Sequence, residues 1–253
     1  MSMFVITENL SPPNRAQASP TVAAAPVLPA SPWYEPAKMA IEFVLALIML
    51  GLSAPLILLA MIFVKLTSPG PTIYSQTRTG RDGKPFTIYK LRSMTHNCEN
   101  LTGAQWSQPG DGRVTTVGRW LRRTHIDELP QLWNVLRGDM SLIGPRPERP
   151  EFLPQLEQAI PLYRERLRIR PGLTGFAQVQ LHPDSDLESV RIKLAFDLHY
   201  VRNMSFFFDT VIYVATVLKV LGVSHQTIGV LCRFPRTDVV DVDYRKLMEP
   251  AAK

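Results

Sequence analysis

The feature that most constrains this chain is a long apolar run. From Phe43 to Val64 the sequence reads FVLALIMLGLSAPLILLAMIFV, 22 residues without a charged side chain. At about 1.5 Å per helical residue the run would measure roughly 33 Å, enough to cross a hydrocarbon core of about 30 Å. Its length therefore predicts a helix in the membrane.

Pro55 lies near the middle of this run and opens a second interpretation. Proline removes a backbone hydrogen bond and clashes with the preceding turn, so it kinks a helix. A sharp break would leave two arms of about ten residues, each some 15 Å long. Such a segment could enter and leave through the same leaflet, with Ser53 bonding the carbonyls that Pro55 frees. Length alone favours one kinked span, and the re-entrant hairpin stays open.

The two flanks of the run differ in composition. Residues 1–36 contain seven prolines and almost no aromatic residue before Trp33, which is typical of a disordered tail. No short apolar core follows a basic start, so the tail does not resemble a signal peptide. On the other side Lys65 is soon followed by Arg78, Arg81 and Lys84. That excess of positive charge predicts that the following domain lies on the cytoplasmic side.

The whole chain is basic. Its 253 residues carry a formal net charge of +6, with 45% hydrophobic and 20% charged residues. This content is normal for a folded protein, and the charge indicates an anionic partner: a nucleic acid, a phosphorylated substrate or an acidic membrane surface. Cys98 and Cys232 are far apart and lack CxxC spacing, which argues against a structural zinc site or a disulfide framework.

Beyond the apolar run the pattern predicts a mixed, mostly helical domain. The segments TIYSQTR and FTIYKLRSM flank GRDGKP, which predicts a β-hairpin with its turn at Asp82-Gly83. Because strand side chains alternate, Lys90 and Arg92 share one face and two cations project side by side. The stretch 95–112 is typical of a loop. The apolar stretch 206–221, interrupted by two charges, predicts an amphipathic helix in the core or at the membrane surface.

An adjacent acid pair, Asp127 and Glu128, stands among arginines. The surrounding cations are Arg122, Arg123, Arg137, Arg146 and Arg149. A purely structural interpretation is available, because Thr124 and Asp127 match a capping-box variant and acids suit a first helical turn. The next apolar residues share one helical face, and Gly138 lies where a C-cap belongs. They are Leu129, Leu132, Trp133 and Leu136.

Pro130 complicates that interpretation. If Thr124 were the cap, Pro130 would lie inside the helix and cost about 3 kcal/mol. If Asp127 is the N-cap, Pro130 is tolerated, but it supplies no N–H for the capping carboxylate. We therefore expect at least one carboxylate to point outward from a helix N-terminus that favours anions. Plain surface salt bridges, at about 0–1 kcal/mol each, and phosphoryl chemistry both stay open here.

Three long motifs resemble the bacterial sugar transferases, the monotopic phosphoglycosyl transferases. They are SPGPTIYSQTRTGRDGKPFTIYKLRSM, VGRWLRRTHIDELPQLWNVLRGDMSLIGPRP and RPGLTGFAQV, and they stand in the family's order behind one Pro-broken hydrophobic segment. The resemblance implies an α+β, mostly helical fold with a re-entrant membrane helix, a β-hairpin and amphipathic interfacial helices. The implied parts are a disordered Pro-rich tail over 1–36, the re-entrant helix over 37–66, a cytoplasmic transferase domain over 67–222 and a C-terminal extension over 223–253.

The resemblance also implies a reaction. Family members transfer a sugar-1-phosphate from a UDP-sugar to undecaprenyl phosphate at the cytoplasmic face of the bacterial inner membrane, release UMP and start glycoconjugate or exopolysaccharide synthesis. The family's dyad falls on Asp127, as the nucleophile that forms a covalent phosphosugar intermediate, and on Glu128. The dyad works with Mg²⁺ in the family, so both carboxylates are expected metal ligands. The expected substrate-binding residues are Lys90, Arg92, Arg122 and Arg146, of which Arg92 is added here from its place on the strand.

The chain departs from the family's pattern at two places. Ala54 separates Ser53 from Pro55, where the family often has Ser-Pro, and QLHPDSD follows PGLTGFAQV in place of an Asn-Gly-Arg-Asn-like run. The chain resembles the family's short form, without the multi-span N-terminal region of the longer members. For four further polar residues a place near the site stays open, but an ordinary surface or core position is expected: His125, His182, Asp197 and His199.

Two alternatives stay open. The chain could be a non-catalytic membrane-anchored protein that binds anionic lipid or nucleic acid through its basic surface, in which case Asp127 is dispensable. Alternatively, Glu128 could be the nucleophile. The resemblance favours a UDP-sugar, undecaprenyl phosphate and membrane lipid as partners and no nucleic acid. It leaves open a homo-oligomer and the identity of the sugar.

Overall fold

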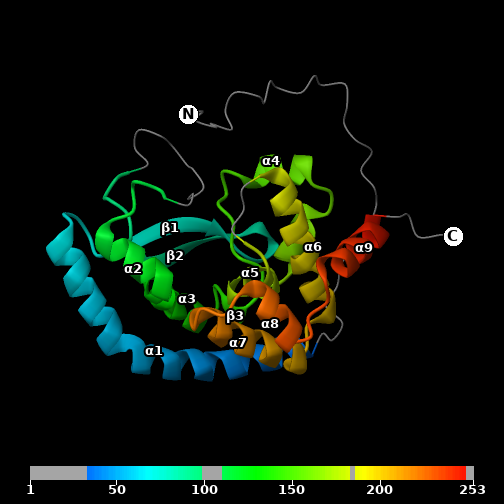
Figure 1. The fold of residues 1–253 in the computed structure, drawn as a ribbon, viewed down its shortest axis with the longest axis horizontal. Coiled ribbons are helices and arrows are strands. Elements are labelled where there is room, and N and C mark those ends of the chain that lie inside the picture. The colour runs from blue at the N-terminus through cyan, green and yellow to red at the C-terminus, as the bar shows by residue number, and fades with distance from the viewer. Residues whose placement is uncertain (1–32, 99–109, 183–185, 249–253) are drawn as a thin grey trace, which may run out of the picture.

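One long helix underlies the molecule. The structure is a computed structural model and describes residues 33–98, 110–182 and 186–248 (Figure 1). Helix α1, Tyr34–Thr67, has 34 residues and, among the described residues, is the one helix long and apolar enough to cross a membrane by length and composition. It begins inside the stretch expected to be a tail, while residues 1–32 of that expected tail lie outside the described residues.

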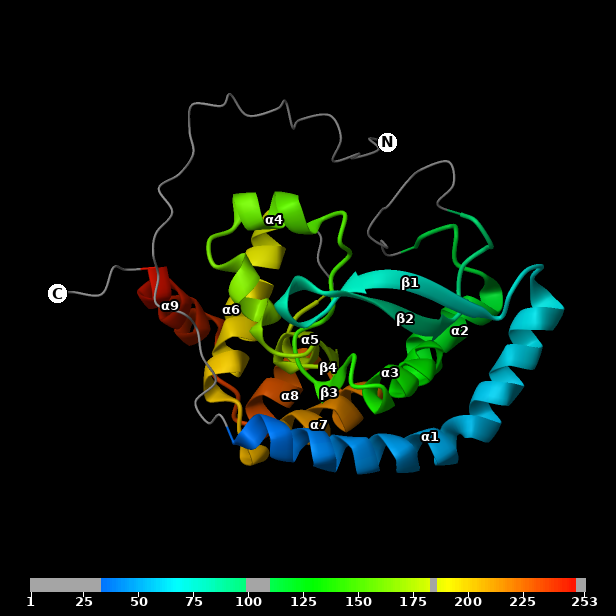
Figure 2. The same ribbon diagram turned by 180° about the vertical axis from the view of Figure 1, so that it is seen from behind.

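Helix α1 is continuous through Pro55, but it is not straight. Figure 2 shows its first part running beneath the domain and its later, cyan part turning up toward α2. Pro55 has no N–H to give to the Gly51 carbonyl, which accounts for a bend. The Ser53 hydroxyl donates to the Leu50 carbonyl at 3.3 Å. The expected break is thus a bend within one helix, and the re-entrant path stays a prediction.

The predicted hairpin is confirmed. Strands β1, Ile73–Thr79, and β2, Pro85–Leu91, pair antiparallel over their whole length. Their connection has Asp82 at a φ of 55° and Gly83 at a φ of 80°. Glycine and aspartate tolerate this left-handed backbone, which is why Asp-Gly is a strong turn signal.

The segment around the acid pair folds differently from the expectation. Helix α2, Thr116–Thr124, ends where His125 adopts a φ of 56°, and the Thr124 hydroxyl donates back to carbonyls of its own helix. Thr124 is the last residue of α2, and the left-handed His125, not Thr124, is the N-cap of the next helix, so the predicted capping box is wrong. A 3₁₀ helix, Ile126–Gln131, carries Asp127 in its first turn, so Asp127 is not an N-cap either.

Only part of the predicted apolar face after the dyad exists. Helix α3 is short, Leu132–Leu136, and Gly138 follows it with a φ of 81°, the left-handed C-cap that the sequence predicts. Leu132 is fully buried, whereas Trp133 is 52% exposed. The 3₁₀ turn shifts the angular positions relative to a continuous α-helix, since it has three residues per turn.

The rest of the chain is mostly helical around a second small sheet. Strands β3, Ser141–Ile143, and β4, Gly172–Thr174, pair in parallel. The remaining elements are α4 (Leu153–Ala159), a 3₁₀ helix (Tyr163–Arg168), α5 (Phe176–Gln180), α6 (Leu187–Asn203), α7 (Phe206–Val220), α8 (His225–Leu231) and α9 (Thr237–Met248). An α+β, mostly helical fold is therefore confirmed. Much of the expected loop 95–112 lies outside the described residues.

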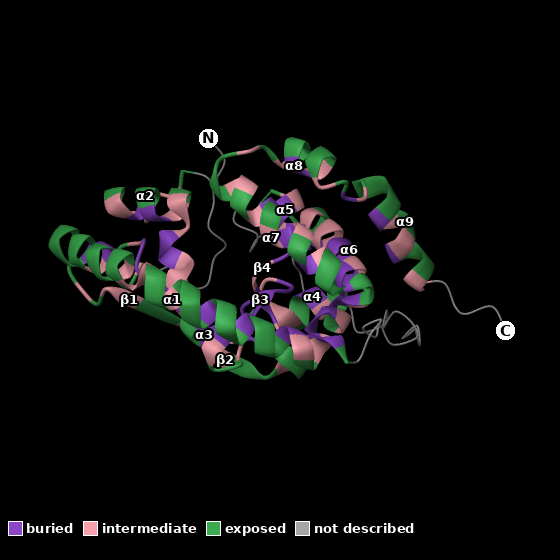
Figure 3. Cartoon of the chain, turned by 90° about the horizontal axis from the view of Figure 1, so that it is seen from below, coloured by how far each residue is buried: buried purple, intermediate pink, exposed green. Residues whose placement is uncertain are grey.

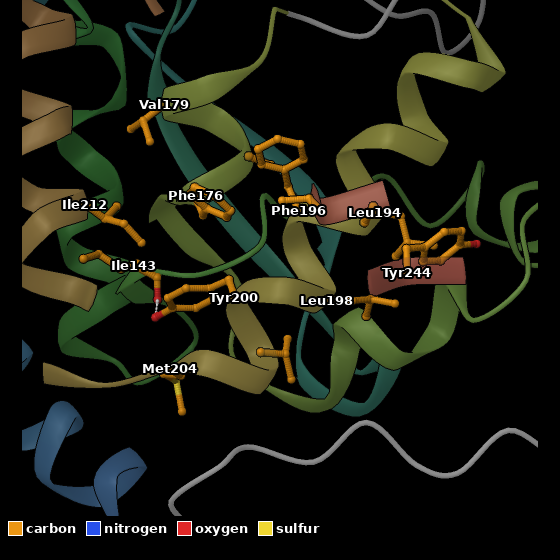
Figure 4. Close-up of a cluster of buried hydrophobic side chains, with 14 of the residues drawn as sticks. Ile143, Phe176, Val179, Leu194, Phe196, Leu198, Tyr200, Met204, Ile212 and Tyr244 are labelled. Atoms are coloured by element: carbon orange, nitrogen blue, oxygen red, sulfur yellow. Dashed lines mark hydrogen bonds between the residues drawn. The ribbon is translucent and has the colours of Figure 1, made fainter. Parts of the chain in front are cut away.

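The main core lies between α5, α6 and α7. Phe176, Phe196 and Leu194 pack there with residues of the other helices, and the Tyr200 hydroxyl reaches the Ile143 carbonyl of β3 at 3.4 Å (Figure 4). Helix α9 joins the same core through buried Tyr244. The described part of the stretch expected as a C-terminal extension thus packs on this core.

A buried polar network fastens the beginning of α1 to this core. Lys38 Nζ lies 2.5 Å from Asp209 of α7 and 3.0 Å from Glu42. Glu42 accepts hydrogen bonds from the Ser141 hydroxyl at 2.6 Å and from the Ile143 N–H at 3.2 Å. Buried charges are costly unless they are paired and hydrogen-bonded, and these are both.

Much of α1 is exposed, as the green parts of its ribbon in Figure 3 show, and the exposed residues are largely apolar. Its exposed side chains include Phe43, Leu47, Ile48, Leu52, Leu58, Leu59, Ile62 and Leu66. Helix α7 adds Phe206, Phe207, Val214, Val217 and Val220. An apolar surface of this extent is unusual on a soluble monomer and indicates contact with a membrane or a partner.

Candidate active site

Glu128 is held from two sides. Lys90 Nζ, from β2, donates to Glu128 Oε1 at 3.0 Å, and Arg146 Nη2, from the segment after β3, donates to the same oxygen at 2.5 Å. Burial alone would raise the pKa of Glu128, but the charges of Arg146 and Lys90, with their hydrogen bonds, hold it well below its usual range. Glu128 is therefore an ionised carboxylate whose orientation is set by two cations.

Asp127 is restrained far less. It is 6% exposed, yet among the described residues no group donates a hydrogen bond to its carboxylate. Burial, and then the Glu128 charge, raises the pKa of Asp127, while the charges of Lys90, Arg122 and His125 lower it. The two neighbouring acids thus differ: one is paired and fixed, the other is buried and uncommitted.

A buried amide aligns the dyad with β2. Asn134 of α3 is fully buried, and its Nδ2 donates to the Thr87 carbonyl at 2.7 Å while its Oδ1 accepts the Tyr89 N–H at 3.2 Å. These bonds fasten the helix that follows the dyad to the strand that carries Lys90. The contact between Lys90 and Glu128 follows from this alignment.

Helix α2 lies close against Ser93, two residues after β2, because of a glycine. Gly118 lies against the Ser93 carbonyl, so that a Cβ at this position would lie 1.9 Å from the oxygen. Thr115 caps the helix by accepting the Gly118 N–H at 2.9 Å. One turn later Arg122 Nε donates to Ser93 Oγ at 2.8 Å. Arg122 is held there near enough to influence the dyad electrostatically.

Behind Arg146 stands a buried pair that the sequence did not reveal. Arg166 Nη2 donates to the Arg146 carbonyl at 2.9 Å and lies 2.7 Å from Asp197 Oδ2, while its Nη1 donates to the Tyr163 hydroxyl at 2.8 Å. Asp197, expected to be an ordinary residue, thus acts on the site through Arg166. The available signal was a lone acid on the buried face of α6, which demands a partner.

Arg92 does not join the cluster. Strand β2 ends at Leu91, and Arg92 Nη2 turns to the Ser68 carbonyl and hydroxyl, both at 2.7 Å. A Cβ on Gly70 would lie 2.3 Å from Arg92 Nη1, so the glycine makes room for this side chain. The structure therefore brings together Lys90, Asp127, Glu128 and Arg146, with Arg122 close by, and places Arg92 at the end of α1. The alternation rule fails because the strand stops one residue earlier.

Of three histidines, two contact residues outside the dyad and one affects the dyad through its charge. His182 packs edge-on against His225, with ring centroids 5.0 Å apart. His199 Nδ1 lies 3.6 Å from Asp243 of α9. His125 adjoins the dyad and affects it through its charge, as described above for the pKa of Asp127.

The two carboxylates of the dyad could hold a metal cation only together with further ligands, such as water or substrate phosphates. No cluster of three or more acidic, histidine or cysteine ligands occurs within the described residues. In the same part of the chain, both oxygens of Asp127 and Oε2 of Glu128 accept no hydrogen bond, so they stay available. Mg²⁺ is commonly held by one or two carboxylates with water and substrate phosphates completing its shell. The donor set fits that kind of site.

Comparison with known proteins gives consistent matches. Residues 33–223 match the sequence model of the family described as Bacterial sugar transferase. A UDP-N-acetylgalactosamine-undecaprenyl-phosphate N-acetylgalactosaminephosphotransferase of Aeromonas hydrophila is 44% identical over 191 residues, 76% of this chain and 45% of that protein. A UDP-glucose:undecaprenyl-phosphate glucose-1-phosphate transferase of Caulobacter vibrioides is 46% identical over 73% of this chain and 69% of its own length.

A putative undecaprenyl-phosphate N-acetylgalactosaminyl 1-phosphate transferase of Bacillus subtilis is 51% identical over 56% of this chain and 82% of its own length. The chain therefore spans a little under half of the Aeromonas relative and most of the other two. Both segments that carry the site, around Lys90 and from Arg122 to Arg146, lie within the residues matched to the family.

Proposed function

The chain belongs to the bacterial sugar transferase family, and on that premise we propose that it transfers a sugar-1-phosphate from a UDP-sugar to undecaprenyl phosphate. The names of the Aeromonas and Caulobacter relatives state both substrates, a UDP-sugar and undecaprenyl phosphate. The proposed reaction takes place at the cytoplasmic face of the bacterial inner membrane and starts the synthesis of a glycoconjugate or exopolysaccharide. The sugar differs among the relatives, so it is left open.

The observation that carries this proposal is the asymmetry of the dyad. Glu128 is fixed and ionised between Lys90 and Arg146, whereas within the described part of the chain no donor competes for the lone pairs of the Asp127 carboxylate. A nucleophile must be free to move toward phosphorus, and an orienting group must not. The contacts therefore favour Asp127 over Glu128 as the nucleophile.

The first step forms a covalent intermediate. An oxygen of the Asp127 carboxylate attacks the sugar-bearing phosphorus of the UDP-sugar, and the bond to the bridging diphosphate oxygen breaks. UMP leaves with that oxygen and the bonding electron pair, and an aspartyl-phosphosugar remains. In this proposal Lys90, Arg122 and Arg146 pair with the phosphate oxygens and the developing charge.

The second step restores the enzyme. A phosphate oxygen of undecaprenyl phosphate attacks the same phosphorus, and the bond to the Asp127 oxygen breaks. The products are a free carboxylate and undecaprenyl-diphosphosugar. Two separate steps suit a soluble donor and a membrane-bound acceptor, because the two need not occupy the site together.

We further propose that Mg²⁺ binds the dyad. Asp127 and Oε2 of Glu128 would hold it, and the ion would supply charge neutralisation for the diphosphate. Within this arrangement Glu128 keeps its two cations through Oε1, so one carboxylate group serves both purposes.

The proposed membrane placement rests on how α1 contacts the domain. Near its beginning, Lys38 and Glu42 bond to residues of α7 and β3, and near its end Ala60 and Val64 pack against α2 and β2. A straight span would carry those two ends to opposite sides of a bilayer. The bend and the shared contacts favour a re-entrant helix whose exposed apolar face enters one leaflet.

The test of the reaction uses the full chain in lipid nanodiscs. Radiolabelled UDP-sugars with Mg²⁺ and without acceptor should label the protein and release UMP, and the label should move to undecaprenyl phosphate on its addition. The proposal is wrong if Asp127→Asn keeps full labelling and turnover. For the membrane path, single cysteines near Met1 and at Lys84 in a Cys98→Ser/Cys232→Ser background should react from the same face of the membrane.

A further inference from the structure

One lysine lies at the end of the exposed apolar surface of α7 and turns its ammonium inward. Lys219 occupies the last turn of α7, and the neighbouring Val217, Val220 and Leu221 are 59%, 50% and 74% exposed. The ammonium does not follow them outward. Lys219 Nζ donates to the Gln178 carbonyl of α5 at 2.6 Å, so the lysine turns toward the interior of the domain.

The end of α7 is tied to the segment that carries Arg146. One turn before Lys219, the hydroxyls of Thr216 and Thr174 lie 2.9 Å apart. Thr174 of β4 also accepts the Gly144 N–H at 2.9 Å, two residues before Arg146. Burial lowers the pKa of Lys219 most, and the charge of Arg146 lowers it further while that of Glu128 raises it. The lysine is thus within electrostatic reach of the dyad.

The ammonium has capacity to bind an anion. It carries three N–H donors, and the Gln178 carbonyl accepts one of them. Within residues 33–98, 110–182 and 186–248 no carboxylate lies within ion-pair distance of it. A partly buried ammonium without a carboxylate partner is stabilised by a negative charge placed next to it.

We propose that Lys219 binds the phosphate of the lipid acceptor, and that the exposed face of α7 beside it receives the first isoprenoid units. The inference rests on the function proposed above and assigns a residue to its second substrate. An acceptor of this kind is an anion joined to a long apolar chain. Lys219 has a charged site on one side and an exposed apolar surface on the other, which matches that combination. The UDP-sugar has no apolar tail to place on α7.

The kinetic test compares the two half-reactions in nanodiscs. Lys219→Gln should raise the KM for undecaprenyl phosphate about tenfold or more, since a charge-assisted hydrogen bond to phosphate is lost. Labelling by the donor without acceptor should change less than about twofold, because that step precedes acceptor binding. Lys219→Arg should restore most of the acceptor affinity. Lys84→Gln, an exposed lysine in the hairpin turn, removes the same charge and should leave both steps as in the wild type.

A binding measurement separates this inference from the reaction itself. Farnesyl phosphate should bind the full wild-type chain in detergent, and Lys219→Gln should bind it about tenfold more weakly at an unchanged unfolding temperature. Farnesol and inorganic phosphate should each bind far more weakly. A wild type that no UDP-sugar labels would refute the reaction, while the binding arm still tests Lys219. Three results overturn the inference. The wild type and Lys219→Gln bind farnesyl phosphate equally well, inorganic phosphate binds as tightly as farnesyl phosphate, or Lys219→Gln slows the donor step as much as the acceptor step.

Discussion

The dyad's two acids should respond oppositely to neutral substitution. Glu128 accepts two hydrogen bonds from cations, each worth about 1.5–3 kcal/mol, against about 0.5–1.5 kcal/mol for the neutral amide of Glu128→Gln. The loss is therefore about 1–1.5 kcal/mol per bond. The Arg146 side chain is 36% exposed, so its share is discounted for solvent screening. We expect Glu128→Gln to lower the free energy of unfolding by about 2 kcal/mol.

Asp127→Asn should leave stability unchanged or slightly higher. Burial raises the pKa of Asp127, so its charged form is disfavoured in the folded protein, and the amide removes that cost. Both substitutions should abolish turnover, since one removes the nucleophile and the other releases the cations. The assay is thermal unfolding in one detergent, where about 2 kcal/mol corresponds to roughly 4–8 °C for a domain of this size.

The pH dependence of these differences follows from the signs of the shifts. The pKa of Glu128 is lowered on folding, so its contribution is present above about pH 4.3 and is lost as the pH falls through the folded pKa. The loss of stability caused by Glu128→Gln should therefore become smaller at low pH. The pKa of Asp127 is raised, so any gain of the Asn variant is present above the folded pKa and vanishes below about pH 4. Equal destabilisation by both substitutions at neutral pH would refute the asymmetry.

Three further predictions concern the surroundings of the dyad. Arg166→Met should lower the free energy of unfolding by about 3–5 kcal/mol in a denaturation assay, because it takes the guanidinium away from the buried Asp197 carboxylate. The control Arg164→Met, at an exposed arginine, should change it by less than about 0.5 kcal/mol. Gly118→Ala should push α2 away and raise the KM for the UDP-sugar, and Gly112→Ala, which has open space for a Cβ, should not. Arg122→Gln should move the acid limb of the kcat/KM profile to higher pH, because it removes a charge that lowers the pKa of the dyad's aspartate; an unmoved limb contradicts the electrostatic role.

Local signals predicted the hairpin and the C-terminal end of α3. An Asp-Gly turn and a glycine after a short helix act through their own backbone preferences, so neighbouring residues suffice to recognise them. The start of the helix at the dyad was missed for the opposite reason. His125 adopts a left-handed conformation that its residue type does not predict. As a result, Thr124 is the last residue of α2 and not the cap of the next helix.

The long-range contacts of the site could not be predicted from spacing. Asp197 contacts Arg146 through Arg166, and the packing of α7 on α5 and β4 turns Lys219 toward the Gln178 carbonyl. Each partner lies more than 30 residues away in sequence or acts through an intermediate residue. By contrast, the resemblance gave the residues of the dyad and its cations at once. It could not say that Glu128 rather than Asp127 would hold the cations.

The polar network at the beginning of α1 supports the proposed re-entrant path over a straight span. Length alone favours a span, because 22 uncharged residues suffice. A straight span, however, would have to separate Lys38 from Asp209 and Glu42 from Ser141. Breaking one buried charge pair costs about 3–5 kcal/mol, and the released charges would then face lipid or the far side of the membrane. Bending at Pro55 costs one backbone hydrogen bond instead, and the apolar face stays available to lipid. The bent arrangement costs less free energy and keeps both ends of α1 on the domain, as the proposed transfer to a membrane-bound acceptor requires.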